Sequence, residues 1–133
     1  MFDEQIINGD ALYPDQERAP GVRFKIRLPW YRSLPLSCIE QVDLRIDGRE
    51  VQQKDMSLTL YGINHSLDEL PGLHNAWWFI LDTADLHIRT RDQLPPGHHE
   101  VSVTLGCRIP YLTEGEFKEV AHCQKSLMLE EKE

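Results

Sequence analysis

Apolar and polar side chains alternate along much of this chain. From Val22 to Leu28, four apolar residues are interleaved with three cations, and Val42, Leu44 and Ile46 repeat the same spacing. Because successive side chains of a strand point to opposite faces, this pattern predicts strands with one buried and one hydrated face. Comparable alternation predicts further strands at 56–60, 86–89, 101–107 and 120–129.

Turn signals separate these runs. The Asp47-Gly48 dipeptide is a strong hairpin signal, and the run from Pro95 to Gly97 forces a turn. No segment sustains the 3.6-residue period of a helix. About seven to nine short strands separated by turns are typical of an all-β sandwich or barrel. We expect an antiparallel β-sandwich that forms a single domain over residues 1–133.

One short helical turn is expected within this all-β chain. Ser66 and Glu69 stand at the spacing of a capping box, in which each side chain bonds the other residue's backbone amide. Pro71 and Gly72 follow directly and should end the turn at once.

Residues 77–81 read Trp-Trp-Phe-Ile-Leu, which predicts a strand that is apolar on both faces. The tryptophan pair has two interpretations. Aromatic faces pack well on sugar rings, so Trp77 and Trp78 could form a sugar-binding surface. We favour the simpler interpretation, in which one tryptophan belongs to the core and its neighbour lines the other sheet face or an interface.

The segment from Leu28 to Ile39 departs from the alternating pattern. Its two prolines remove backbone donors, so it cannot be a central strand. The same segment contains Trp, Tyr, Arg and several leucines. Large apolar and aromatic groups on an irregular segment are typical of a cover over the core or of a contact with another molecule.

Composition narrows the classes of partner. Of the 133 residues, 14 are Lys or Arg and 22 are Asp or Glu, so the formal net charge is −8. That sign argues against nucleic acid and against an anionic membrane surface. No apolar run approaches the ~20 residues of a membrane span. The acidic start, the missing leader pattern and an odd count of three cysteines lead us to expect a cytoplasmic protein.

A search for catalytic chemistry yields no convincing constellation. No His-x-His pair is present, and the adjacent His98 and His99 should point to opposite faces of a strand. We interpret them as turn and surface histidines. Cys107 and Cys123 lie in alternating strands and read as buried, inert thiols. We therefore predict no catalytic residue, no metal ligand and no cofactor in this chain. Four acidic residues are assigned to a solvated face: Glu40, Asp43, Asp47 and Glu50.

Four stretches of the sequence together resemble a known family. They are Arg27 to Glu40, Val42 to Gly48, Leu67 to Pro71, and Leu94 to Leu105. The Leu-Pro-x-Tyr-Arg-x-Leu-Pro-Leu-Ser-Cys-Ile-Glu portion of the first stretch is long and compositionally unusual. In these stretches the chain resembles the β subunit of bacterial C-glycoside deglycosidases.

The resemblance implies a division of labour between two chains. Such β subunits resemble β-sandwiches and pair with an isomerase-like TIM-barrel α subunit, in a higher hetero-oligomer. The α subunit is expected to carry a divalent metal, manganese being the expected ion, and the proton-transfer residues. The implied activity is that of a carbon–carbon lyase that cleaves the C-glycosidic bond of 3-keto C-glycosides of the flavonoid type.

On this hypothesis the proline-interrupted segment is part of the α-subunit interface, with its aromatic and Arg side chains as anchors. The predicted contact residues are Leu28, Pro29, Trp30, Tyr31, Arg32, Leu34, Pro35 and Leu36. The simpler alternative is that this segment only closes one end of the sandwich.

Two other functions stay open at this stage. A stand-alone carbohydrate-binding or protein-interaction module is suggested by Trp30, Trp77 and Trp78. A self-sufficient enzyme in a small barrel is the weakest hypothesis, because no acid–base or metal set is visible in the sequence.

Overall fold

Strands make up most of the computed structural model, which describes residues 6–15, 20–28, 33–79, 82–90, 94–109 and 118–129. The strands in this part of the chain are β1 (Ile7–Pro14), β2 (Gly21–Arg27), β3 (Leu34–Pro35), β4 (Ile39–Ile46), β5 (Arg49–Val51), β6 (Met56–Leu60), β7 (Ile63–Ser66), β8 (Trp77–Trp78), β9 (Thr83–Arg89), β10 (Gly97–Arg108) and β11 (Lys118–Leu129). The helical elements among the described residues are the short 3₁₀ helices η3 (Leu36–Cys38), η4 (Gln53–Asp55) and η5 (Leu67–Gly72). The all-β class expected from the alternating pattern is confirmed.

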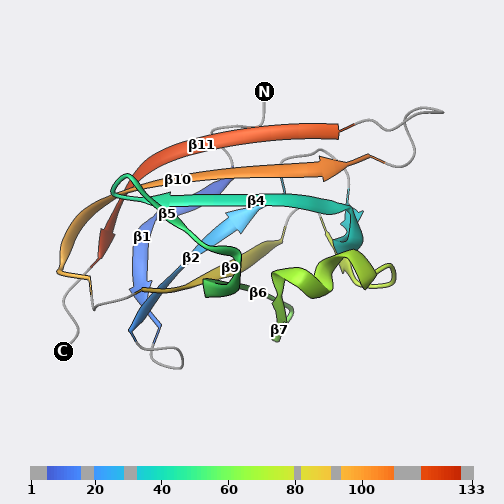
Figure 1. Cartoon of the computed structure of the whole chain (residues 1–133), viewed down its shortest axis with the longest axis horizontal. Coiled ribbons are helices and arrows are strands. Elements are labelled where there is room, and N and C mark those ends of the chain that lie inside the picture. The colour runs from blue at the N-terminus through green and yellow to red at the C-terminus, as the bar shows by residue number, and fades with distance from the viewer. Residues whose placement is uncertain are drawn as a thin grey trace.

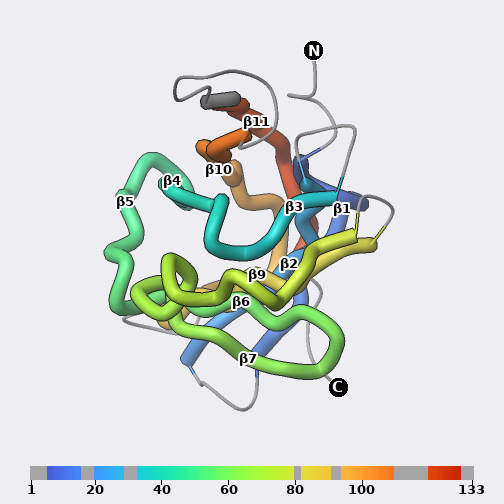
Figure 2. Tube along the Cα trace, turned by 90° about the vertical axis from the view of Figure 1, so that its right-hand side faces the viewer, coloured from blue at the N-terminus to red at the C-terminus, as the bar shows by residue number. Residues whose placement is uncertain are grey.

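Nine of these strands form one curled sheet in the order β5-β4-β10-β11-β1-β2-β9-β6-β7 (Figure 1). The sheet bends near β1 and β2, so that the half containing β4, β10 and β11 lies opposite the half containing β9, β6 and β7 (Figure 2). The prediction of an antiparallel sandwich of two sheets therefore needs correction, because the strands form a curled half-barrel. The alternating pattern identified the buried face of each strand but carried no information on strand partners.

β1 is the strand that joins the two halves. It pairs antiparallel with β2 and parallel with β11, where Ala11 faces Met128 and Leu12 faces Leu129. The register with β2 shifts between Asn8 and Tyr13, and Gly9 within this stretch has a positive φ of 86°. Irregularities of this kind bend a strand and increase its twist. The bend lets one strand contribute to both halves, and its pairing with β11 departs from the all-antiparallel prediction.

The hydrophobic core lies between the two halves of the curled sheet. Phe24 of β2 and Leu86 of β9 face it from one half, and Val103 of β10 and Leu127 of β11 face it from the other; all four are fully buried. Burial of each such side chain stabilises the fold by about 1.5–3 kcal/mol relative to exposure. The core is therefore built by the apolar positions that the alternating pattern marked.

The two local predictions on turns are confirmed. Asp47 and Gly48 have φ values of 52° and 82° and connect β4 to β5 in a two-residue hairpin. At η5, the backbone amide of Ser66 donates to Glu69 Oε1 over 2.6 Å, and the capping box is complete. The helix does not stop before the proline, however, since it includes Pro71 and runs to Gly72.

The segment around the two tryptophans forms a second, small sheet. β3 and β8 pair antiparallel, with Leu34 opposite Trp78 and Pro35 opposite Trp77. Trp78 is fully buried and donates through Nε1 to the Asp82 carbonyl over 2.8 Å, whereas Trp77 is exposed. The interpretation that one tryptophan belongs to the core is confirmed. The predicted five-residue strand is shorter, and residues 80 and 81 lie outside the described residues.

Candidate functional site

The leucines of the predicted contact segment point into the core of this chain. Leu28, Leu34 and Leu36 are 4%, 1% and 0% exposed. Their side chains pack within the hydrophobic core of this subunit, and the pairing of β3 with β8 places Leu34 opposite the buried Trp78. Pro35 is half-buried. Four further predicted contacts lie outside the described residues: Pro29, Trp30, Tyr31 and Arg32. The interface assignment for this segment stays a prediction.

A cluster of exposed apolar side chains lies next to this segment. We call it the aromatic patch; it consists of Tyr61, Ile63, Trp77 and Phe79, with exposed fractions of 54%, 60%, 47% and 55%. Tyr61 lies in the turn between β6 and β7, Ile63 begins β7, and the other two residues belong to or follow β8. The rings of Tyr61 and Phe79 are 6.1 Å apart between centroids. An apolar cluster of this kind is typical of an interaction site.

Hydrogen bonds fix the Tyr61 side chain of the aromatic patch relative to Phe79 and Asp82. The Tyr61 hydroxyl donates to Asp82 Oδ2 and accepts the backbone amide of Phe79 over 3.1 Å. Partial burial, together with the hydrogen bond to Asp82, raises the pKa of Tyr61 above its ordinary value of 10.0. The hydroxyl therefore stays protonated near neutral pH. Asp82 in turn accepts from Trp78 through its carbonyl, so a single residue links the exposed rings to a buried one.

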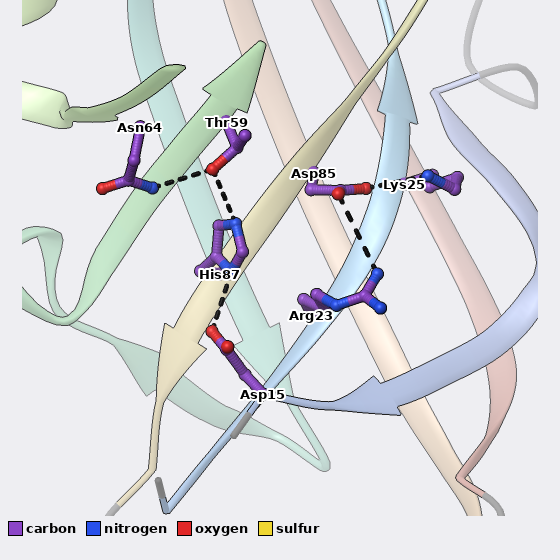
Figure 3. A network of polar contacts seen from close by, with 7 residues as sticks. All are labelled: Asp15, Arg23, Lys25, Thr59, Asn64, Asp85 and His87. Carbon is purple, nitrogen blue, oxygen red and sulfur yellow. Dashed lines mark hydrogen bonds and ion pairs between the residues drawn. The ribbon is translucent and has the colours of Figure 1, made fainter. Parts of the chain in front are cut away.

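A second candidate is a chain of polar side chains on the outer face of β6 and β9 (Figure 3). His87 Nδ1 lies 2.7 Å from Asp15 Oδ2, and His87 Nε2 lies 2.8 Å from Thr59 Oγ1. Asn64 Nδ2 donates to the same Thr59 oxygen over 2.9 Å and to Ser57 Oγ over 3.1 Å. The chain joins the end of β1 to β9, β6 and β7.

An Asp–His–hydroxyl chain can activate a nucleophile in hydrolases. In this protein Thr59 is bonded on both sides, since Asn64 donates to it while it faces His87. Asp15 and His87 are both buried, which leaves little room for a substrate to approach the hydroxyl. We therefore interpret these contacts as a cross-link between strands rather than as a catalytic site.

Beside this chain, cations of β2 meet a carboxylate of β9 (Figure 3). Lys25 Nζ donates to Asp85 Oδ1 over 3.1 Å, and Arg23 Nη1 lies 3.9 Å from Asp85 Oδ2. The Arg23 guanidinium also lies 4.9 Å from the centre of the Tyr13 ring. These groups are partly exposed, and such pairs contribute only about 0–1 kcal/mol each. They are an ordinary hydrated sheet face.

A third cluster pins the start of β10 to the hairpin between β4 and β5. His99 Nδ1 lies 2.6 Å from Asp47 Oδ2, and His99 Nε2 lies 2.8 Å from the Pro95 carbonyl. The Glu100 amide donates to Asp47 Oδ1 over 2.9 Å. Two interpretations from the sequence need correction. His99 was interpreted as a turn or surface histidine, but it is buried. Asp47 was assigned to a solvated face; it is exposed, but its carboxylate contacts His99 and accepts from the Glu100 amide.

This pairing shifts the pKa values of both partners. Burial lowers the pKa of His99, but the bonds to the Asp47 carboxylate and the Pro95 carbonyl outweigh it, so the net pKa lies above 6.5. Burial raises the pKa of Asp47, but hydrogen bonds from His99 and Glu100 outweigh it, so the net pKa lies below 3.8. Both shifts favour the charged pair.

The sequence carried only weak signals for these clusters. His87 alternates with Leu86 and Ile88 and reads as a hydrated position, and nothing local connects it to Asp15. The aromatic patch had a partial signal, because Tyr61 and Gly62 directly follow the alternating run at 56–60. Its two other rings belong to the run that begins at Trp77. Proximity of these groups follows from strand order, which the sequence pattern does not contain.

The part of the chain that the structure describes contains neither a cluster of metal-ligating side chains nor a disulfide. No group of three or more His, Cys, Asp or Glu side chains comes together there as a ligand set. All three cysteines are buried and form no disulfide: Cys38, Cys107 and Cys123. The burial of Cys107 and Cys123 agrees with the interpretation from the strand pattern. No helix within the described ranges is long and apolar enough to cross a membrane.

Comparison with known proteins relates most of the chain to one family. The family model of the C-glycoside deglycosidase beta subunit matches residues 2–111. A 3'-dehydrocarminate deglycosidase beta subunit of Microbacterium sp. is 39% identical over 112 residues, which cover 84% of this chain and 82% of that protein. Two C-glycoside deglycosidase beta subunits are also similar. The protein from Microbacterium trichothecenolyticum is 36% identical over 116 residues, covering 84% of this chain and 82% of the relative. The protein from Arthrobacter globiformis is 34% identical over 112 residues, covering 84% and 83%.

The match includes every described element from β1 to β10 and contains the β4–β5 hairpin, the aromatic patch and the His99–Asp47 pair. Its extent and the identity of the relatives agree with the resemblance seen in the proline-interrupted segment. On these grounds the chain belongs to the C-glycoside deglycosidase beta subunit family.

Proposed function

We propose that this chain is the small subunit of a heteromeric carbon–carbon lyase in the cytoplasm, which cleaves the C-glycosidic bond of 3-keto C-glycosides of the flavonoid type. Family membership over residues 2–111 is the observation that carries the proposal. The relatives' name, beta subunit, implies a partner α subunit, and we propose a larger, isomerase-like TIM-barrel chain for that role. The two chains would form a higher hetero-oligomer.

The chemistry that we propose belongs to the α subunit. A ketone at sugar C3 acidifies the neighbouring C–H, and a base of the α subunit removes that proton. The electron pair moves toward the ketone oxygen to give an enediolate. When the ketone re-forms, a double bond forms between C1 and C2 of the sugar, the bond from C1 to the aglycone carbon breaks, and that carbon takes up a proton. A divalent ion held by the α subunit, for which we propose manganese, would stabilise the developing negative charge. This chain would support the α subunit without a catalytic residue of its own.

Two features of the described residues favour a non-catalytic role for this chain. In the buried His87 and His99, both ring nitrogens make hydrogen-bond contacts within the subunit. The exposed aromatic patch, by contrast, has apolar surface that nothing in the chain covers among the described residues. Both features fit a non-catalytic subunit that binds another protein through an exposed apolar surface.

Co-expression tests the proposal. This chain would be produced alone, with a candidate isomerase-like TIM-barrel chain, and the latter would be produced alone. Size measurement and chromatography of the aglycone released from a 3-keto C-glycoside would follow. We expect a defined complex and turnover only when both chains are present. Turnover by this chain alone, or failure of any such α chain to bind it, would refute the proposal.

The co-expression experiment also tests the proline-interrupted segment through a double variant. Trp30→Ala combined with Arg32→Ala should weaken the complex if this segment is an anchor. Unchanged complex formation and turnover would show that the segment only closes one end of the fold.

One observation favours a second candidate function. Trp77 is exposed two positions before Phe79, whose ring lies 6.1 Å from that of Tyr61, and exposed aromatic side chains are expected of a surface that stacks on sugars. A stand-alone carbohydrate-binding module would show saturable changes in tryptophan fluorescence with sugars or glycosylated flavonoids in the absence of any partner.

A further inference from the structure

We propose that the aromatic patch is the main docking surface for the α subunit, and that it binds an apolar hollow on that subunit. The inference rests on the proposed function and makes it specific. It moves the centre of the interface from the proline-interrupted segment to Tyr61, Ile63, Trp77 and Phe79. Among the described residues, these are four of six large hydrophobic side chains that are exposed, and the other two, Tyr13 and Val120, lie on β1 and β11.

The area of the patch argues for a partner that contacts more than the patch itself. With about half of each side chain exposed, the four residues present on the order of 400 Å² of apolar surface. A stable interface takes roughly 800 Å² from each partner. The patch is therefore a suitable centre for an interface, and the surrounding surface must supply the remainder.

The proline-interrupted segment is the natural source of additional area. β3 begins directly after Ser33 and pairs with β8, so that Pro35 stands opposite Trp77. This pairing brings part of the predicted contact segment to the border of the aromatic patch. A subunit that covers the patch would meet Pro35 at its rim.

The Tyr61 part of the patch is held in place by hydrogen bonds before any partner arrives. Tyr61 has a positive φ of 52° and Gly62 one of 79°, which places the ring at the tip of a tight turn. The Tyr61 hydroxyl ties this turn to Asp82 and to the Phe79 amide. Rigid aromatic groups lose little conformational entropy on binding, so this arrangement favours a protein contact.

A second copy of this chain is a poor occupant of the patch. Each copy carries a formal net charge of −8, so two copies repel each other. A different chain, with an apolar hollow and basic groups around it, fits the surface better.

A sugar is a poor occupant for a different reason. Sugar recognition combines ring stacking with polar groups that are free to bond hydroxyls. Next to these rings, the Tyr61 hydroxyl already donates to Asp82 and accepts from Phe79. The Tyr61 hydroxyl is thus engaged within the protein, and the apolar ring faces are the main binding feature of the patch.

The test uses the complex of this chain with the isomerase-like TIM-barrel chain. Ile63→Ser is compared with Val120→Ser, because both positions are branched and similarly exposed, at 60% and 56%, but lie on β7 and β11. Trp77→Ala combined with Phe79→Ala is compared with Tyr13→Ala. We expect the Kd to rise at least about tenfold for each patch variant and to stay within about twofold for each control. Thermal unfolding verifies that each variant is folded.

The outcomes separate this inference from the proposed function. If the wild-type chains do not associate, the proposed function fails and this inference fails with it. If they associate and the folded patch variants bind like the controls, only the docking site is wrong. A homodimer abolished by Ile63→Ser, or saturable sugar binding lost in Trp77→Ala, would also overturn the inference in favour of another occupant.

Discussion

At the scale of single residues, His99 and Asp47 link protonation to folding. The two ring nitrogens of His99 face a carboxylate and a carbonyl, both of which only accept, so the doubly protonated ring satisfies both contacts. Because the pKa of His99 is raised, its contribution to stability is complete below 6.5 and is lost as pH rises through the folded value. Because the pKa of Asp47 is lowered, its contribution is complete above 3.8 and is lost as pH falls.

We therefore predict that the pair stabilises the protein most between pH 3.8 and 6.5. The measurement is a double-mutant cycle of Asp47→Asn and His99→Gln, with the free energy of unfolding determined by denaturant at several pH values. The coupling between the two positions should decline above neutral pH. A coupling that grows as the pH rises would contradict this sign.

At the scale of elements, the hairpin between β4 and β5 depends on its two turn residues. Arg45 pairs with Glu50 and Ile46 with Arg49, which leaves Asp47 and Gly48 as the turn. Both have positive φ, the conformation that matches the twist of the flanking strands. A side chain at Gly48 would have free space but a strained backbone.

Gly48→Ala should accordingly lower the free energy of unfolding by about 1 kcal/mol. Gly72→Ala is the matched control, because a Cβ there also meets nothing within 4 Å and its backbone lacks a positive φ. We expect little or no loss from the control, measured by chemical denaturation. Equal losses at both positions would mean that conformational strain is not the cause.

At the scale of the whole molecule, the curled sheet encloses all three thiols. Cys38 follows β3, whereas Cys107 and Cys123 lie on β10 and β11, and all are buried. Burial raises the pKa of Cys38 above 9.0, although the nearby Arg108 acts in the opposite direction. The thiolate is the reactive form, so burial and the raised pKa of Cys38 both slow its modification.

The native protein should therefore resist a thiol reagent such as dithionitrobenzoate, and denaturant should release three reactive thiols per chain. The colour change with and without denaturant measures this directly. Rapid modification of any thiol, with the circular dichroism of the folded state retained, would show that the core opens locally at that position.

Much of the molecule could be predicted from local patterns. Alternation identified the inward residues of β2, β4 and β10, because side-chain direction in a strand depends only on position along the chain. The Asp47-Gly48 turn and the capping box at Ser66 depend on contacts among neighbouring residues, and both are confirmed. The family resemblance of the proline-interrupted segment likewise lies in the order of its residues alone, and the family comparison agrees with it.

Contacts between distant parts of the chain were decided only by the tertiary structure. Strand order turned an expected sandwich into a curled half-barrel, since β1 bends and pairs with both β2 and β11. The same order buries Leu34 in the core, pairs His87 with Asp15 across 72 positions and places Tyr61 against Phe79. The amino-acid sequence by itself determined which faces are apolar and where the chain turns, because those depend on local geometry. Which faces meet, and which one is left uncovered, depends on long-range strand pairing that no local pattern encodes.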